Sequence, residues 1–381
     1  MDKRIYLLAA INFVMGLVEM APAGILPNIA KDLDIPLAAA GQLLGLFSLA
    51  FAVAAPVLQV LTARFERKRV LLWSLAGFSL ATLWGAFAPS FAMQLTARVL
   101  QASAGGLMCG TLFGFAHHIA TPVYRGRAIA LVMMGISSAI VLGVPLGIQL
   151  AEWAGWRSLF ALSVALALPA MLAAWAWLPS VPGKAAVPLR MQLHTLRDLK
   201  LLSAHGVTML MMCGHFTVYV FLAAYAEQVL GLSAREASAM YLVFGLAGMT
   251  GGWLGGSGSD RWGGPRAAAG AGLALLLALA LLPLVADNVA LAAALVLLWA
   301  MSAWGSTPAV QHYIASSAPE SVGIQLGLNL AALNFGLAAG AALGGAVLNW
   351  APLRLLPWTG ALAVGLALLT LRYSANRQRA R

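Results

Sequence analysis

The chain is a succession of long apolar segments separated by short polar connections, and several of these connections carry proline or glycine. Each apolar segment holds about 20 residues, which is the length that a helix needs to cross the hydrocarbon core of a bilayer. We therefore predict an all-α membrane protein with twelve transmembrane helices, at residues 5–29, 38–61, 70–88, 91–117, 127–151, 157–178, 203–228, 236–258, 266–286, 289–314, 322–349 and 355–373.

The second half of this pattern repeats the first at an offset of 197 residues. The register holds at separated landmarks, which are 33–36 with 230–233, Arg64 with Arg261, Gly126 with Gly323, Gly143 with Gly340, and Gly147 with Gly344. Secondary transporters built from such parallel repeats bind substrate between the halves, near the bilayer midplane. We predict two six-helix halves, 1–178 and 203–381, and a cytoplasmic linker, 179–202. The second part of this linker, 189–202, is basic enough to form an interfacial helix.

The composition agrees with a membrane protein, and the basic residues orient it. The chain is 61% hydrophobic and 9% charged, with a mean hydropathy of +0.87. Of its 23 lysine and arginine residues, 18 fall on the side of the N-terminus, four on the opposite side, and one inside a span. Basic loops lie on the cytoplasmic side, so we predict a multi-pass protein of the cytoplasmic (inner) membrane with both termini in the cytoplasm. The net charge of +11 is then explained by basic residues in cytoplasmic loops, which face an anionic leaflet.

The residues do not point to an enzyme. A hydrolase needs a serine or cysteine near a histidine and an acid, and Glu19 is the only acid deep inside a span. Cys109 and Cys213 both lie in apolar segments, which favours small core residues over a disulfide. We expect no cofactor, no metal site and no nucleic-acid partner. The expected partners are protons, a small-molecule substrate and the lipid bilayer, and the expected state is a monomer.

Two ionisable side chains, Glu19 and Arg98, lie deep inside predicted spans. Such residues cost about 2.5–3.5 kcal/mol at the centre of a span, and they face the bundle interior or a wet cavity. At about 1.5 Å per residue, Glu19 and Arg98 reach similar depths from opposite membrane faces. Burial favours the neutral form of Glu19 and a nearby Arg98 favours the charged form, a balance that suits a proton carrier. The alternative is a permanent Glu19–Arg98 pair that fixes helix packing.

Other polar side chains inside spans are candidates for a substrate site. His215 lies about 12 residues into the seventh span, where an imidazole could bind substrate, titrate near neutral pH, or simply hydrogen-bond a neighbouring helix. Each of the remaining candidates could equally join two helices. They are Asn12, Gln42, Gln101, Tyr219, Asn329 and Asn334.

Glycine and proline distinguish two spans. In the fifth span Gly143 and Gly147 permit close helix contact, and Pro145 between them removes a backbone donor and bends the helix. This element predicts a hinge or a seal against ion leakage. The run 251–258 has the glycine content of a phosphate loop but lacks its Lys-Ser/Thr ending, so we interpret it as close helix packing.

These segments resemble the major facilitator superfamily over essentially the whole chain. The loop "LTARFERKRVLL" and its repeat copy "SGSDRWGGPR" are similar to that family's basic loop, and "RVLQASAGG" resembles its fourth-span motif. "GISSAIVLGVPLG" followed by "GWRSLF" resembles the fifth-span motif of antiporters and the turn after it. The first span, "GLVEMAPAGILPNIAKDL", is similar to that of the drug:proton antiporter group, which includes exporters of arabinose and other sugars, purine nucleosides and chloramphenicol-type drugs.

The resemblance implies the major facilitator fold and efflux driven by inward proton flow. It assigns proton coupling to Glu19 and Arg98, and the antiporter seal to Gly143, Pro145 and Gly147. The gating residues that it implies are Arg64, Arg67, Lys68 and Arg69 in one loop copy and Asp260 and Arg261 in the other. The chain departs from the family loop at Ala63, where an acid often stands, and at Glu66, where glycine is common.

We therefore predict a secondary active transporter that exports a small molecule (sugar, nucleoside or drug) in exchange for protons by alternating access. A proton symporter or uniporter that imports a small polar nutrient would share this fold, and the direction of transport distinguishes the two. A membrane enzyme or structural protein is the third class. One acid, one base, amides and aromatic rings suit a neutral polar solute or an amphiphilic drug.

Overall fold

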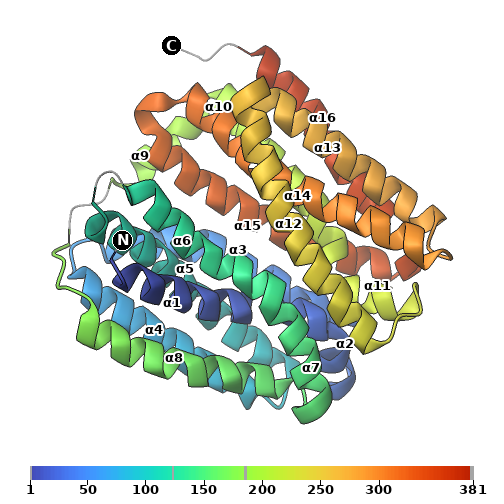
Figure 1. Cartoon of the computed structure of the whole chain (residues 1–381), viewed down its shortest axis with the longest axis horizontal. Coiled ribbons are helices and arrows are strands. Elements are labelled where there is room, and N and C mark those ends of the chain that lie inside the picture. Colours follow the sequence, from blue (N-terminus) through green and yellow to red (C-terminus); the bar gives the residue numbers. More distant parts are fainter. Residues whose placement is uncertain (1, 122–123, 184–186, 378–381) are drawn as a thin grey trace. The chain divides into compact units, whose positions relative to one another are not determined.

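The computed structural model of this chain describes residues 2–121, 124–183 and 187–377 (Figure 1). Lys184, Arg379 and Arg381, which contribute to the predicted orientation, lie outside these ranges, as do linker residues 185–186. Every regular element in the described ranges is helical, and twelve helical segments there are long and apolar enough to cross a membrane. The predicted fold class is confirmed, and the chain is a multi-pass integral membrane protein.

The twelve spans begin and end within a few residues of the predicted bounds. The first six are α1, η1 and α2 (Arg4–Met20, Ala21–Ile25, Leu26–Asp32), α3 (Leu37–Leu61), α4 (Arg67–Ala86), α5 (Phe91–Ile119), α6, η3 and α7 (Arg125–Ser138, Ala139–Gly143, Val144–Ala154), and α8 (Arg157–Trp177). The second six are α10 and α11 (Leu199–Tyr219, Leu222–Gln228), α12 (Ala234–Trp262), α13 and η5 (Gly264–Leu281, Leu282–Leu284), α14 (Val289–Ser317), η6 and α15 (Pro319–Ser321, Val322–Leu348), and η7 and α16 (Leu353–Leu355, Leu356–Asn376).

Equivalent helices of the sequence repeat pack in equivalent pairs. Helix α1 packs on α6 and α8, while α10 packs on α15 and α16; α4 packs on α5 and α8, while α13 packs on α14 and α16. The first span of each copy is also interrupted at the same register, by η1 in one copy and by a turn at Val220–Phe221 in the other. The sequence predicts these two spans as unbroken helices, so the structure corrects that expectation.

The chain divides into two compact units, each with its own core. Residues 1–35 and 50–189 form the first unit, and residues 36–49 and 190–381 form the second. Within the second unit, Gln42 on α3 donates from Nε2 to the carbonyl oxygens of Ala341 (3.2 Å) and Ala38 (3.4 Å). These units differ in their bounds from the halves 1–178 and 203–381, which remain a prediction from the sequence repeat. Below, inner and outer refer to the orientation predicted from the basic residues.

The linker is only partly helical. Helix α9 covers Leu189–His194, a 3-10 turn covers Thr195–Arg197, and neither contains a buried residue. The Asp198 carboxylate then accepts a hydrogen bond from the backbone N–H of Lys200 (2.9 Å) at the start of α10. An interfacial helix over 189–202 is therefore not formed, because residues 199–202 are the first turn of a membrane span.

Candidate functional site

Glu19 and Arg98 meet in the first unit, and both are buried, with 8% and 0% of their surface exposed. Nη1 of Arg98 donates to the carbonyl oxygen of Val18 (2.6 Å) and to Oε1 of Gln101 (3.1 Å), and Nη2 donates to the carbonyl oxygen of Glu19 (3.3 Å). The N–H of residue 22 would normally bond to the Val18 carbonyl, but residue 22 is a proline. Arg98 therefore supplies donors to a helix end that Pro22 leaves unsatisfied.

Arg98 binds the backbone carbonyl of Glu19 and forms no ion pair of 4.0 Å or less with its carboxylate in the described structure. The Glu19 carboxylate takes part in none of the ion pairs of 4.0 Å or less found in the described part of the chain. Arg98 thus contacts Glu19 through the backbone carbonyl, while the carboxylate lies nearby without a salt bridge. A change in protonation at the carboxylate does not have to displace the guanidinium from α1.

A column of polar side chains extends along α5 beside this pair. Gln101 is fully buried and donates from Nε2 to the carbonyl oxygen of Ala81 on α4 (3.3 Å). Gln94, one turn before Arg98, is also fully buried, and neither of its amide atoms has a hydrogen-bond partner among the described residues. Gly85 leaves room for both glutamines, since an added Cβ would lie 3.2 Å from each amide. Sequence reasoning missed Gln94 because a glutamine so near a span end is expected to reach water.

The fifth span packs closely along the first. A Cβ on Gly143 would lie 2.7 Å from Leu17, and one on Gly16 would lie 2.9 Å from Ala139. Asn12 is fully buried and donates from Nδ2 to the carbonyl oxygen of Val132 (2.8 Å), so it joins two helices. The close contact that Gly143 predicts is therefore present, and its role as a seal stays a prediction.

Pro145 coincides with a local change of helix type. The five residues Ala139–Gly143 form a π-helix directly before α7, which has Pro145 in its first turn. Without an N–H, Pro145 cannot bond to the carbonyl of Val141, and a wider turn accommodates the missing bond. The repeat partner of Pro145 is Ala342, and α15 runs as an unbroken α-helix there.

In the second unit, His215 lies at the centre of a group of aromatic rings. Nε1 of Trp299 donates to Nδ1 of His215 (2.8 Å), and the ring centroids of His215 and Tyr219 are 5.3 Å apart. Phe244 stacks on His215 at 6.1 Å. His215 and Tyr219 were predicted from sequence; Trp299 and Phe244 were not, because an aromatic residue in an apolar span carries no signal of what it faces.

Polar pairs join α10 to α15 at the inner end of this unit. Nδ2 of Asn329 donates to Oγ1 of Thr208 (2.7 Å), and Nε2 of His205 lies 3.0 Å from Oε1 of Gln325. Asn334 donates to the carbonyl oxygen of Leu330 in its own helix (3.1 Å). Asn329 therefore joins two helices in this structure. The other predicted substrate residues that do so are Asn12, Gln42 and Gln101.

The predicted gating residues lie at inner helix ends. Arg69 pairs with Glu66 (2.8 Å), the residue at which the chain departs from the family loop, and the backbone N–H of Arg67 donates to the carbonyl oxygen of Val181 (2.9 Å). In the second copy Asp260 lies 3.9 Å from His312, and the Arg261 guanidinium lies 5.9 Å from the Trp262 ring. Arg64 and Lys68 take part in none of the ion pairs found among the described residues.

Repeat-related arginines tie the outer helix ends in each unit. Arg157 pairs with Asp32 and donates to the carbonyl oxygen of Ala88 (3.0 Å), while its repeat partner Arg354 pairs with Asp287 (2.7 Å) and donates to the carbonyl oxygen of Pro283 (3.1 Å). The Arg354 guanidinium holds the pKa of the Asp287 carboxyl below its usual range. Both contacts are exposed, so they contribute mainly to geometry.

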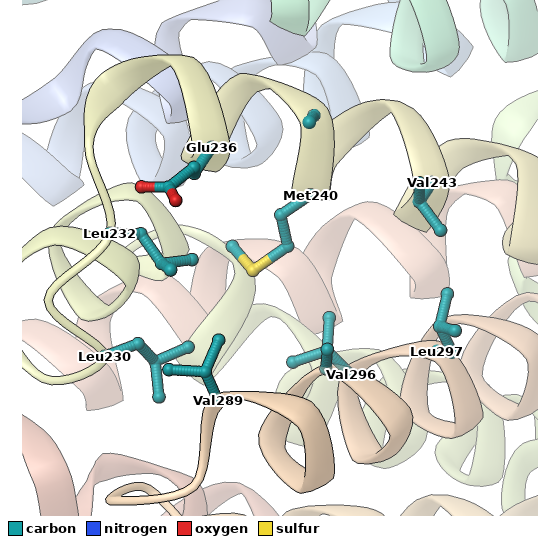
Figure 2. A pocket seen from close by; sticks show the side chains of 10 residues that line it. Leu230, Leu232, Glu236, Met240, Val243, Val289, Val296 and Leu297 are labelled. Carbon is teal, nitrogen blue, oxygen red and sulfur yellow. The ribbon is translucent and has the colours of Figure 1, made fainter.

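A pocket of about 310 Å³ lies between the outer ends of α12 and α14 (Figure 2). Figure 2 shows Met240 and Val243 facing Val296 and Leu297 across the pocket, with Glu236 at one end. Farther along the same two helices the backbones touch, since a Cβ on Gly251 would overlap the backbone of Met301. The Glu236 carboxylate already accepts hydrogen bonds from the Ser233 backbone (2.8 Å) and hydroxyl (2.7 Å). This apolar pocket is therefore a poor site for proton chemistry.

Comparison with known proteins agrees with this architecture. Residues 8–341 match the sequence profile of the Major Facilitator Superfamily. YbcL of Bacillus subtilis (strain 168), named an uncharacterized MFS-type transporter, is 33% identical over 375 residues, which cover 98% of this chain and 96% of YbcL. YdhP, an inner membrane transport protein of Escherichia coli (strain K12), is 30% identical over 371 residues, which cover 96% of this chain and 94% of YdhP.

Solved transporter structures share the fold. A bacterial homolog of the human lysosomal transporter Spinster, in an inward-facing and occupied conformation, matches 99% of this chain and 98% of its own with a TM-score of 0.80 at 16% identity. The human organic anion transporter MFSD10 matches 97% of this chain and 98% of its own with a TM-score of 0.68 at 18% identity. The resemblance to the superfamily is confirmed, and the drug:proton antiporter group stays a prediction. This chain therefore belongs to the Major Facilitator Superfamily and is a membrane transporter of that kind.

Proposed function

We propose that this transporter exports a small molecule in exchange for protons by alternating access, and that Glu19 carries the proton. The observation that supports this most is the buried Glu19 carboxylate beside a guanidinium that is already bound to the α1 backbone and Gln101. A buried carboxylate without a salt bridge is costly when charged, so it takes up a proton readily when its surroundings close. Arg98 lowers the cost of the charged form. The carboxylate therefore responds to both conformation and substrate.

The location of Glu19 links protonation to helix movement. Glu19 precedes the break at Ala21–Ile25, and Arg98 binds the carbonyls on the helix side of that break. A conformational change about this break alters the surroundings of the carboxylate, and by linkage a change in protonation alters the conformational equilibrium. The π-helical segment before Pro145 packs against the same helix, so the fifth span would move with it.

Glu19→Gln should abolish proton-coupled transport while the protein still folds and inserts, because the amide keeps the shape of the side chain but cannot release a proton. The measurement is proton release from acidified inside-out vesicles when sugars, nucleosides and drugs are added one class at a time. Glu152→Gln is the matched control, since Glu152 is an exposed carboxylate on α7. Full coupling in Glu19→Gln would reject Glu19 as the proton carrier.

The same vesicles distinguish export from import. An exporter that exchanges substrate for protons dissipates the gradient as the substrate enters the lumen. A symporter would instead carry substrate and protons out of preloaded vesicles together, and a uniporter would leave the gradient unchanged. Either of these results would replace the antiport proposal and leave the family assignment intact.

A further inference from the structure

The ring group of the second unit, which we call the aromatic cage, consists of His215, Phe216, Tyr219, Phe244, Trp299 and Trp304. Its members come from three helices: α10, α12 and α14. The centroid of His215 lies 4.5 Å from that of Phe216, 5.6 Å from that of Trp299 and 6.0 Å from that of Trp304. All except Trp304 have at most 1% of their surface exposed. The cage is therefore a packed group of rings inside the membrane-spanning part of this unit.

The hydrogen bond from Trp299 determines the tautomer of His215. An indole N–H can only donate, so Nδ1 of His215 accepts, and the neutral imidazole carries its hydrogen on Nε2. This Nε2–H has no hydrogen-bond partner in the described structure, and neither does the hydroxyl of Tyr219. Two polar groups of one cage, both nearly fully buried, are thus left with unused hydrogen-bonding capacity.

Ring packing alone does not account for these two groups. A buried donor without a partner costs stability, and a phenylalanine would fill the place of Tyr219 without that cost. Buried polar groups without partners are uncommon in folded proteins, and one explanation for them is a partner that binds during function. His215 and Tyr219 have ring centroids 5.3 Å apart, and two neighbouring rings that both carry an unpartnered polar group point to such a partner.

The sequence repeat shows that this chemistry is particular to the second unit. At an offset of 197 residues, Phe216 corresponds to Glu19, Tyr219 to Pro22, and Trp299 to Ala102. The first unit thus has a buried acid, Glu19, where the second has the ring of Phe216, and its Arg98 corresponds to Leu295. The two units thus share one architecture, but the first contains a charged site and the second an uncharged aromatic site.

We propose that the aromatic cage binds the transported substrate, and that this substrate is an uncharged, flat heteroaromatic molecule with hydrogen-bond acceptors. The assignment rests on the proposed transport function and specifies its substrate class. Aromatic rings favour offset-stacked and edge-to-face contacts with one another, so a flat ring suits a group of aromatic side chains. His215 donates from Nε2 and Tyr219 from its hydroxyl to acceptors on the ligand. No carboxylate or basic ammonium belongs to the cage, so an ion would enter it unpaired.

The test is direct binding to the purified full-length protein in detergent, by isothermal titration and without a proton gradient. The probes are caffeine and N-methylquinolone, which are flat, uncharged and carry acceptors but no strong donors. Arabinose and tetraphenylphosphonium are the non-aromatic and the cationic comparisons. We expect the two flat probes to bind, and Tyr219→Phe to weaken their binding about fivefold to tenfold through loss of one hydrogen bond.

The matched control is Tyr225→Phe. Tyr225 is equally buried, and its hydroxyl also lacks a partner among the described residues, but it lies on α11 outside the cage. This variant should bind the flat probes as the parent protein does. Failure of both flat probes to bind overturns the proposal, as does binding that Tyr219→Phe leaves unchanged or that Tyr225→Phe weakens equally.

These outcomes are separable from the test of proton antiport. If arabinose or tetraphenylphosphonium releases protons from vesicles and the flat probes do not bind, the substrate class is wrong and antiport stands. If the flat probes bind through Tyr219 and no class of substrate releases protons from the vesicles, binding at the cage stands and proton antiport is wrong.

Discussion

Arg98 illustrates how a single residue acquires a structural role that its charge does not reveal. A regular helix would satisfy the Val18 carbonyl with the N–H of residue 22, and Pro22 removes that donor. The guanidinium takes its place at 2.6 Å. Sequence reasoning pairs Arg98 with the Glu19 carboxylate because opposite charges are visible in a sequence, whereas an unsatisfied backbone carbonyl is not.

Substitution of Gln94 should have opposite effects on the stability of the protein and on its transport activity. Gln94→Met keeps the length of the side chain and removes two buried polar atoms without partners. We expect the free energy of unfolding to rise by about 1–3 kcal/mol, and proton-coupled transport to fall several-fold because Gln94 lies one turn from Arg98. Thermal unfolding and vesicle assays measure the two effects.

Gln149→Met, at a half-buried position of α7, is the control and should change neither quantity greatly. If Gln94→Met stabilises the protein and transports at the parental rate, Gln94 has no part in the proton site.

At the scale of elements, the two copies of one helix pair show what proline changes. Helix α15 packs against α10 through Gly336, Gly340 and Gly344 and remains α-helical throughout. Its counterpart packs against α1 through small residues too, but contains the π-helical segment before Pro145. Close packing therefore does not require the π-helix, and the proline accounts for it.

The contact between α10 and α15 depends on the absence of a side chain at Gly340. A Cβ on Gly340 would lie 2.5 Å from the carbonyl oxygen of Cys213 and 2.8 Å from the Thr217 nitrogen, so Gly340→Ala forces α10 and α15 apart. We expect a loss of about 1–3 kcal/mol in the free energy of unfolding, measured by thermal unfolding in detergent.

Gly327→Ala on the same helix is the matched control, because nothing lies within 4 Å of its Cβ position. It should leave stability unchanged or raise it by up to about 1 kcal/mol through helix propensity. Equal losses in both variants would show that the Gly340 contact is not specific.

At the scale of the whole molecule, the repeat gives two units that share helix pairings but differ in chemistry. The first unit carries the buried charged residues Glu19 and Arg98, and the second carries the aromatic cage. Equivalent pairings, such as α1 with α6 and α10 with α15, maintain the architecture while the side chains differ. From this difference follows the proposal that the first unit carries protons and the second unit binds the substrate.

The orientation of the whole molecule in the membrane can be tested at its loops. The basic loops predict that Ser180 faces the cytoplasm and that Asn349 faces outward. Single cysteines placed there report the orientation, because the native Cys109 and Cys213 are only 3% and 8% exposed. A membrane-impermeant maleimide should label Asn349→Cys in spheroplasts and Ser180→Cys in inside-out vesicles, and the opposite pattern would reverse the orientation.

The sequence by itself determined the fold class and the spans. The length of an apolar segment is a local property, and it must match the thickness of the hydrocarbon core of the bilayer. It also determined that Glu19 and Arg98 lie at similar depth, since helix rise is constant. The glycine-rich run 251–258 lacks the Lys-Ser/Thr ending of a phosphate loop, which predicts helix packing, and the structure places all of it within α12.

Only the tertiary structure decided which atoms these residues contact. The breaks at Ala21–Ile25 and Val220–Phe221, the orphaned amide of Gln94 and the rings around His215 depend on neighbours from distant spans. Polar and aromatic side chains in a membrane span have similar sequence signals whether they join helices or face a ligand. Their role is determined by long-range packing, which local hydrophobicity and helix propensity do not encode.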